Sequence, residues 1–288
     1  MRIIWAFLPV KRFMADTEKL CYVDARTGAH RGKMNTDKIK KHLAEYKVNV
    51  LGITENGEWW KNHKKYKHIL PVENKFENII NTELKASLIS LLESDSIHIG
   101  FHHMNSSQAL ALNLFRPLVL SKKLNKIDNV NISDKSVGKF EYIENTNENT
   151  NFDFFISDGD KSNYFEVKYT ENNFGEAKSD QEHKQKYIEI YKKDLQSISD
   201  ISEHEFYKEY QLWRNIIYAK KGNVFFVLPD FRVDLIKKVN DAKTRINNIE
   251  VRNRVHLLSI NNLVSKCKEI PELKNHYCEF EKKYLKIT

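Results

Sequence analysis

The sequence predicts an α/β protein whose core is a mixed β-sheet flanked by helices. Two observations carry this prediction. Short apolar segments rich in aromatic and β-branched residues alternate with segments whose apolar residues recur at helical spacing. From residue 106 onward, these segments follow the order helix, strand, strand, strand, helix, strand. This order is typical of a sheet with helices packed against it, in which some neighbouring strands are parallel and others antiparallel.

Bulk composition is that of a globular protein. The 288 residues are enough for one large domain or for a domain with a smaller appendage, and no apolar run approaches the length of a membrane span. Three widely spaced cysteines without a Cys-x-x-Cys pair argue against a disulfide framework and favour a reducing cytoplasm. The formal charge of +8 suits a polyanionic partner such as nucleic acid, but does not identify one.

Residues 1–72 are predicted to form an N-terminal α/β segment with a role in DNA recognition or dimerisation. An amphipathic helix is expected at 35–46. Three stretches have strand-like composition: 2–10, 19–25 and 48–54. The basic aromatic stretch WWKNHKKYKH follows, and its candidate DNA contacts, by stacking and by phosphate pairing, are Trp59, Trp60, Lys64 and Lys65. A solvated basic surface is the alternative interpretation.

Residues 73–288 are predicted to form the main core, and each element follows from its own pattern. Apolar residues at helical spacing predict helices at 73–93 and 106–116, the second ending at Pro117. Short apolar runs between Asn-, Asp- and Gly-rich turns predict three strands: 138–144, 151–157 and 163–170. The remaining elements are a helix at 203–220, a strand at 223–230, a helix at about 231–247, a strand at 254–260 and a basic helical tail.

Two neighbouring predicted strands carry ionisable residues in their apolar middles. Because side chains alternate along a strand, Glu166 and Lys168 share one face, and Asp153 is expected on the side of Phe155, opposite Phe152. Antiparallel pairing through the tight turn between these strands brings the two carboxylates together. Adjacent carboxylates repel each other unless a cation neutralises them, and oxygen ligands suit Mg²⁺. The pattern alone also allows a solvated strand face.

Five blocks of the sequence occur in an order that matches a known family: HHMNSSQALALNLFRPL, NFDFFI, FEVKYTENNFGEA, YQLWRN and FFVLPD. Together they resemble a bacterial family of type II-like restriction endonucleases in the PD-(D/E)XK nuclease superfamily, over roughly residues 75–265. The resemblance implies that Asp153, Glu166 and the backbone carbonyl of Val167 are ligands of Mg²⁺, for which Mn²⁺ can substitute. It also implies that Lys168 is the catalytic lysine. Phe152 stands where the superfamily motif has a proline that does no chemistry.

Polar residues on the neighbouring predicted helices are candidates for supporting roles. Gln211 and Arg214 lie one turn apart, and the resemblance implies that they are site residues, with Arg214 gripping a phosphate. A surface helix with an Arg–Asn pair is the alternative. In the superfamily, the helix before the core strands often supplies an acid, but here that helix has none. Four residues are therefore considered in its place or beside it: Gln108, Ser107, Asn113 and Glu83.

The resemblance implies a Mg²⁺-dependent endonuclease that hydrolyses phosphodiester bonds of double-stranded DNA in restriction or phage defence. A homodimer is expected, because cutting both strands needs two active sites. Two rivals remain: the same fold acting on RNA or structured DNA, and a non-catalytic nucleic-acid-binding protein. The presence of the complete Asp/Glu/Lys set favours catalysis. A metabolic α/β enzyme is disfavoured, because no G-x-G-x-x-G, P-loop or G-x-S-x-G motif occurs.

Overall fold

The computed structural model describes residues 36–81, 85–86, 97–130, 132–133, 135–146, 151–178 and 180–287. The strands predicted at 2–10 and 19–25, and the candidate Glu83, lie outside the described residues. Residues Lys33–Thr288 belong to one compact unit. The predicted boundary between residues 72 and 73, and the separate role given to the N-terminal segment, stay predictions.

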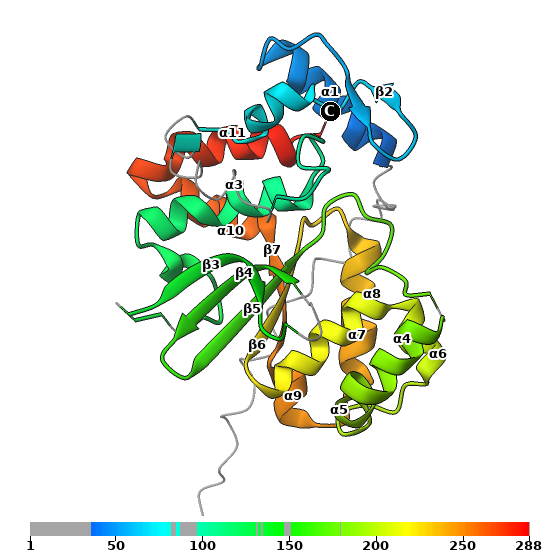
Figure 1. The fold of residues 1–288 in the computed structure, drawn as a ribbon. Coiled ribbons are helices and arrows are strands. Elements are labelled where there is room, and N and C mark those ends of the chain that lie inside the picture. The colour runs from blue at the N-terminus through cyan, green and yellow to red at the C-terminus, as the bar shows by residue number, and fades with distance from the viewer. Residues whose placement is uncertain are drawn as a thin grey trace, which may run out of the picture. The chain divides into compact units, whose positions relative to one another are not determined.

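A five-stranded mixed sheet forms the centre of the fold, in the order β3-β4-β5-β6-β7 (Figure 1). The strands are β3 (Val137–Ile143), β4 (Asn151–Asp158), β5 (Lys161–Val167), β6 (Asn223–Leu228) and β7 (Val255–Ser259). The first three pair antiparallel, and β5, β6 and β7 run parallel. The mixed sheet predicted from the order of elements is therefore confirmed.

Helices cover both faces of this sheet (Figure 1). One face carries α3 (Ser107–Leu120), α10 (Ile260–Lys268) and α11 (Lys274–Tyr284), with α1 (Thr36–Asn49) joining the same core. The other carries α4 (Gln181–Lys186), α5 (Lys192–Gln196), α6 (Glu203–Lys208), α7 (Tyr210–Ile217), α8 (Val233–Thr244) and α9 (Ile249–Asn253). Short π- and 3₁₀-helical segments occur at Val72–Asn78, Leu124–Lys126, Tyr187–Tyr191, Tyr218–Lys220 and Pro271–Leu273. Because side chains alternate along a strand, successive strand residues pack into the cores on opposite faces of the sheet.

The segment after α1 is not the strand predicted at 48–54. The helix continues to Asn49, and the chain then turns at Gly52, whose φ is 70°. Lys47 explains the difference, because its buried ammonium group donates to Asn56 Oδ1 at 3.0 Å and to the backbone carbonyl of Ile69 at 3.4 Å. These bonds tie the end of the helix to the two-stranded hairpin of β1 (Gly57–Trp59) and β2 (Lys64–Tyr66).

Helix α3 runs through Pro117 instead of ending there, which corrects the predicted helix end. A proline has no N–H for the carbonyl four residues earlier, here that of Asn113. His276 of α11 replaces it, with Nε2 lying 2.7 Å from that carbonyl oxygen. The orphaned acceptor is thus satisfied from a neighbouring helix, and α3 can extend across the sheet.

Two other predicted helices differ in detail. The helix predicted at 203–220 is broken at Glu209, where φ and ψ are −126° and 49°. The break lets the backbone N–H groups of Tyr210 and Gln211 donate to the carbonyls of Gly175 and Phe174, at 3.0 and 2.9 Å. The helix predicted at 73–93 begins as a 3₁₀ helix, Val72–Asn78, and most of the rest of that range lies outside the described residues.

Candidate active site

Asp153, Glu166 and Lys168 meet where β4 and β5 pair. The antiparallel register makes Asp153 and Glu166 facing positions, next after the last bonded pair. The Val167 backbone N–H donates to Asp153 Oδ2 at 2.7 Å, and Lys168 Nζ lies 2.7 Å from Glu166 Oε1. The Glu166 and Lys168 side chains are only 6% and 8% exposed, so their ion pair forms largely away from water.

The alternation of sides along β4 is interrupted at Asp153. Phe154 and Ile156 point into the core beside α3, whereas Phe152 and Phe155 both point into the core beside α7. The expectation that Asp153 and Phe155 share one face, opposite Phe152, is therefore wrong, because Phe152 and Phe155 lie on the same side of the sheet. A regular strand cannot place residues three apart on one side, so the backbone is irregular at the acidic position.

Glu141 of β3 brings a third carboxylate to this place, and the pattern analysis missed it. Its φ of 50° lies in the left-handed region, which is uncommon for a residue with a side chain. Its carboxylate accepts hydrogen bonds from the Asn151 side chain and from Gln108 of α3. The signal that could have found Glu141 is the one used for Asp153, an acid inside an apolar strand, here in GKFEYIE.

The electrostatics of these acids follow from burial and crowding. Burial raises the pKa of Asp153 well above its usual range, and the charges of Glu166 and Glu141 raise it further. Lys168 and the Val167 N–H oppose this shift. Burial likewise raises the pKa of Glu141 to about 7, against the hydrogen bonds from Gln108 and Asn151 and with the help of Glu166. A nearby cation would relieve this repulsion.

Lys168 is held in its charged form. Burial lowers its pKa, but the carboxylates of Glu166, Glu171 and Asp153 more than compensate, so that the pKa lies above its ordinary value. Its ammonium group also donates to Gln211 Oε1 at 2.8 Å. A charged amine fixed between a carboxylate and an amide is suited to binding a phosphate oxygen.

Helix α7 presents polar side chains to Lys168 and Glu166 at the end of β5, while the phosphate contact predicted for Arg214 stays a prediction. Gln211 contacts Lys168 directly, and Asn215, which is fully buried, donates to Glu166 Oε2 at 3.0 Å. Arg214 donates to Asn215 Oδ1 at 3.2 Å and lies over the ring of Tyr210, one residue removed from the carboxylates. Asn215 is thus a further candidate site residue, which the selection of Gln211 and Arg214 passed over.

Arg232, which the sequence analysis did not single out, braces the segment after Lys168. It is fully buried, and its guanidinium donates to the backbone carbonyls of Tyr169 and Glu171 at 2.7 and 2.5 Å. The same group pairs bidentately with Asp234 at 3.0 Å. Backbone carbonyls held by a buried arginine have little freedom, so the strand end that carries Lys168 is fixed.

The remaining candidates on α3 lie at different places. Ser107 is the first residue of the helix, after the capping residue Ser106. Asn113 is fully buried, and its side chain bonds to the Ile80 N–H, the Asn78 carbonyl and the Tyr284 hydroxyl at 2.9–3.0 Å. That network joins three segments on the α11 side of the sheet, so Asn113 has a structural task there.

The β1–β2 hairpin carries the predicted DNA contacts Trp59, Trp60, Lys64 and Lys65. Two hydrogen bonds, made by residues of one loop, connect the hairpin to the segment that follows β5. His102 Nε2 lies 3.0 Å from the backbone carbonyl of Glu58, and Asn105, three residues further on, donates to Thr170 Oγ1 at 2.7 Å. Because Thr170 follows Lys168 by two residues, the loop between hairpin and helix connects this basic aromatic surface to the end of β5.

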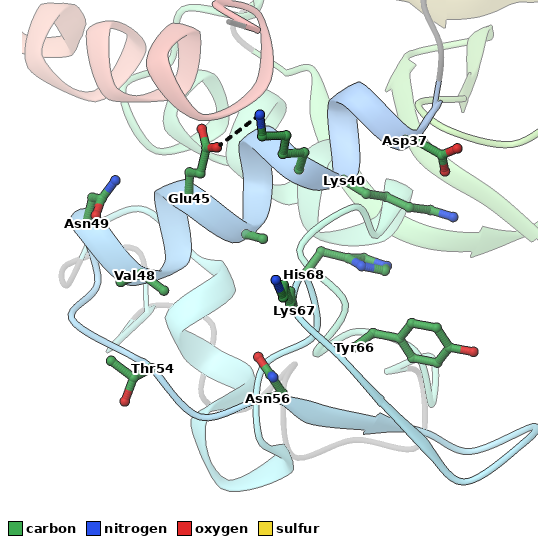
Figure 2. A pocket seen from close by; sticks show the side chains of 12 residues that line it. Asp37, Lys40, Glu45, Val48, Asn49, Thr54, Asn56, Tyr66, Lys67 and His68 are labelled. Atoms are coloured by element: carbon green, nitrogen blue, oxygen red, sulfur yellow. Dashed lines mark ion pairs between the residues drawn. The ribbon is translucent and has the colours of Figure 1, made fainter.

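A pocket of about 760 Å³ lies between α1 and the hairpin segment, where Figure 2 shows Lys40, Lys67, His68 and Tyr66 around it. None of the carboxylates of β3, β4 and β5 lines it. Burial and the charges of Lys40 and Lys47 lower the pKa of His68 to about 4. The pocket is therefore separate from the acidic centre, by which we mean the carboxylates of Glu141, Asp153 and Glu166.

The acidic centre fits a hard divalent cation through its donor chemistry. Within the described part of the chain, no three His, Cys, Asp or Glu side chains are already gathered as a metal-binding set. Mg²⁺, however, commonly uses one or two protein carboxylates and completes its shell with water and substrate phosphate. Asp153 and Glu166 supply such a pair, and their mutual repulsion is what a cation would offset.

Comparison with known proteins identifies the family. Over the described residues, no helix is both long and apolar enough to cross a membrane. Neither the curated proteins nor the solved structures include a match to the chain. Residues 40–285 match the family described as "Restriction Endonuclease associating with ARP", which spans the sheet, both helical layers and the acidic centre. With most of its length matched, the chain belongs to this restriction endonuclease family.

Proposed function

We propose that the protein is a Mg²⁺-dependent endonuclease that hydrolyses the phosphodiester bonds of double-stranded DNA, in restriction or phage defence. The observation that carries the proposal is the buried Glu166–Lys168 ion pair beside the half-buried Asp153 at the junction of β4 and β5. Restriction endonucleases typically use divalent metal ions, and the two carboxylates with the Val167 carbonyl would supply oxygen ligands for Mg²⁺ or Mn²⁺.

Each site residue has a defined task in this proposal. When bound, Mg²⁺ supplies Lewis-acid activation of the scissile phosphate and of a water molecule. Lys168 binds a non-bridging phosphate oxygen and stabilises the negative charge that develops on it. Gln211 orients the Lys168 amine, and Asn215 holds Glu166 in place. Arg214, which donates to Asn215, would bind a neighbouring phosphate of the substrate.

The reaction is a hydrolysis. The oxygen of the attacking water forms a new bond to phosphorus, in line with the leaving group, and the bond from phosphorus to the 3′-oxygen breaks. The attacking water gives up one proton to the solvent, and the leaving 3′-oxygen takes up one proton. The products are a 5′-phosphate and a 3′-hydroxyl. Because one such site cuts one strand, we expect two copies of the chain to act together on a duplex.

Incubation of unmethylated plasmid and phage DNA with Mg²⁺ or Mn²⁺ tests the proposal. We expect discrete fragments that disappear with EDTA and with Asp153→Asn. Metal-dependent smearing would retain the nuclease and remove sequence-specific restriction. Cleavage of RNA or branched DNA in preference to duplex would replace the substrate. Plating of phage on cells with the wild-type protein or the variant tests the defence role, since protection must depend on Asp153.

A further inference from the structure

Glu141 occupies the position across from Asp153 on the neighbouring strand. β3 and β4 pair at the positions immediately before and after it, which places the two acids face to face. Facing Cβ atoms in an antiparallel pair lie about 4.5–5.5 Å apart, within the reach of a glutamate side chain. The Glu141 carboxylate repels those of both Asp153 and Glu166, so all three acids lie in one electrostatic neighbourhood.

The backbone at Glu141 adopts a conformation that would suit glycine better. With a φ of 50°, Glu141 is in the left-handed region, where a Cβ crowds the following carbonyl oxygen. The irregularity also separates its neighbours, because Phe140 packs against the core beside α3 and Tyr142 against the core beside α7. The chain therefore keeps a glutamate at a strained position next to two other acids.

The charge at this centre is not balanced by protein cations. Lys168 is the ammonium group paired with Glu166, and among the described residues no lysine, arginine or histidine forms an ion pair with Glu141. Its partners are the neutral amides of Asn151 and Gln108. When Glu141, Asp153 and Glu166 are all ionised, Lys168 offsets one of their three negative charges, and a divalent cation would offset the other two.

We propose that Glu141 is the third carboxylate ligand of the divalent metal ion. The inference rests on the proposed function and adds a ligand from β3 that the Asp/Glu-x-Lys motif does not contain. In the structure the three carboxylates bond to separate donors, so Glu141 must turn from Asn151 when it binds the ion. Gln108, which also accepts from the His98 N–H at 3.0 Å, is the positioning residue for Glu141 and not a ligand.

Binding of Mn²⁺ alone to the full chain, without DNA, tests this inference by calorimetry and by electron paramagnetic resonance of the free ion. Glu141→Gln keeps the size of the side chain and removes its charge, and we expect it to weaken Mn²⁺ affinity by about tenfold or more. Glu144→Gln is the matched control, since Glu144 follows the same strand and accepts from the Tyr142 hydroxyl at 2.9 Å. Its affinity should equal that of the wild type.

The melting temperature is a second readout. A purely structural role of Glu141 would lower the melting temperature of Glu141→Gln, whereas a ligand role should raise it. Without metal, Glu141→Gln should melt higher than the wild type, because one repelling charge is gone, and Mn²⁺ should raise its melting temperature less. A lower melting temperature with an unchanged Mn²⁺-induced rise would contradict the inference. Glu141→Asp, which keeps the charge and withdraws it by one methylene, should also weaken Mn²⁺ binding and serves if the glutamine variant does not fold.

The outcomes separate this inference from the proposed function. If Asp153→Asn abolishes Mn²⁺ binding while both Glu141 variants bind like the wild type, Glu141 is not a ligand and the nuclease proposal stands. If the wild type neither binds Mn²⁺ nor cleaves DNA or RNA, the nuclease proposal fails and takes the inference with it.

Discussion

Gln211 accepts a hydrogen bond from Lys168 at 2.8 Å, although 43 residues separate them in the sequence. The position of Gln211 depends on Gly175, whose φ is 70° and where an added Cβ would lie 3.1 Å from the Gln211 side chain. The loop after β5 therefore contacts Gln211, which in turn bonds to Lys168.

Gly175→Ala should reduce cleavage about tenfold or more, because its methyl group displaces Gln211 and with it Lys168. Gly159→Ala is the control. Its φ of 60° imposes the same backbone strain, but nothing lies within 4 Å of the added methyl group. Both variants should lose about 1–2 kcal/mol of unfolding free energy, and only the first should lose activity. Equal activity in single-turnover assays of the two variants would show that Gly175 has no such role.

Arg232→Lys should destabilise the protein by about 2 kcal/mol or more. A lysine cannot reproduce the two carbonyl contacts and the bidentate pair with Asp234, and it leaves buried acceptors without a donor. Urea denaturation measures the loss. Lys237→Arg, on the exposed side of the same helix, is the control and should leave the midpoint unchanged. A wild-type midpoint for Arg232→Lys would mean that the guanidinium is not needed to fix the end of β5.

The pH dependence of stability should report the crowded acids. The pKa of Glu141 is raised from its usual 4.5 to about 7, so the folded state holds more protons than the unfolded state between these values. Its contribution therefore lowers the free energy of unfolding as pH rises through that window. His68, His103 and His256, whose pKa values fall from 6.5 to about 4, act in the opposite sense between about pH 4 and 6.5.

The difference between Glu141→Gln and the wild type removes the histidine contributions. In EDTA, the stability gained by the variant should be small near pH 4.5 and should grow until about pH 7. Above that pH it should stay level. Urea midpoints at intervals across this range measure the difference. A gain independent of pH would mean that the carboxylate has the same pKa in both states.

The hairpin lysines should contribute to DNA affinity by neutralising phosphates. We expect Lys64→Glu with Lys65→Glu to weaken binding and to flatten the dependence of log affinity on log salt by about 0.9 for each phosphate that is no longer neutralised. Lys192→Glu with Lys193→Glu, at two exposed lysines on α5, changes the net charge by the same amount away from the hairpin and should have a smaller effect. Fluorescence anisotropy over a salt series, in Ca²⁺ to prevent cleavage, distinguishes the two. An unchanged slope would place the DNA elsewhere.

The sequence predicted much of the fold because its signals were local. The strands around Asp153 and Glu166 show short apolar runs with turn residues between them, and their pairing follows from a two-residue turn at Gly159. What could not be predicted depends on partners distant in sequence. Pro117 is tolerated because His276 reaches the freed carbonyl, and Glu141 is marked by a backbone angle that only the folded sheet reveals.

The residues of the candidate site likewise fall into two groups, those that local sequence predicts and those that only the fold reveals. Asp153, Glu166 and Lys168 could be predicted from the sequence because ionisable residues are rare inside apolar strands. Asn215 and Arg232 are not, because a polar residue on an amphipathic helix or in a turn has many ordinary uses. Their tasks follow only from which carboxylate or carbonyl lies opposite them in the fold.

The three acids come from a meander of adjacent strands that is continuous in the chain, from Glu141 to Glu166. Lys168 depends instead on Gln211, and Glu166 on Asn215, which arrive only when α7 docks. Neighbouring antiparallel strands form contacts of low sequence separation, which tend to assemble early in folding. We therefore expect the newly made chain to gather its negative charges before it can hold the lysine in place, so that a nascent molecule would capture cations before it could cut nucleic acid.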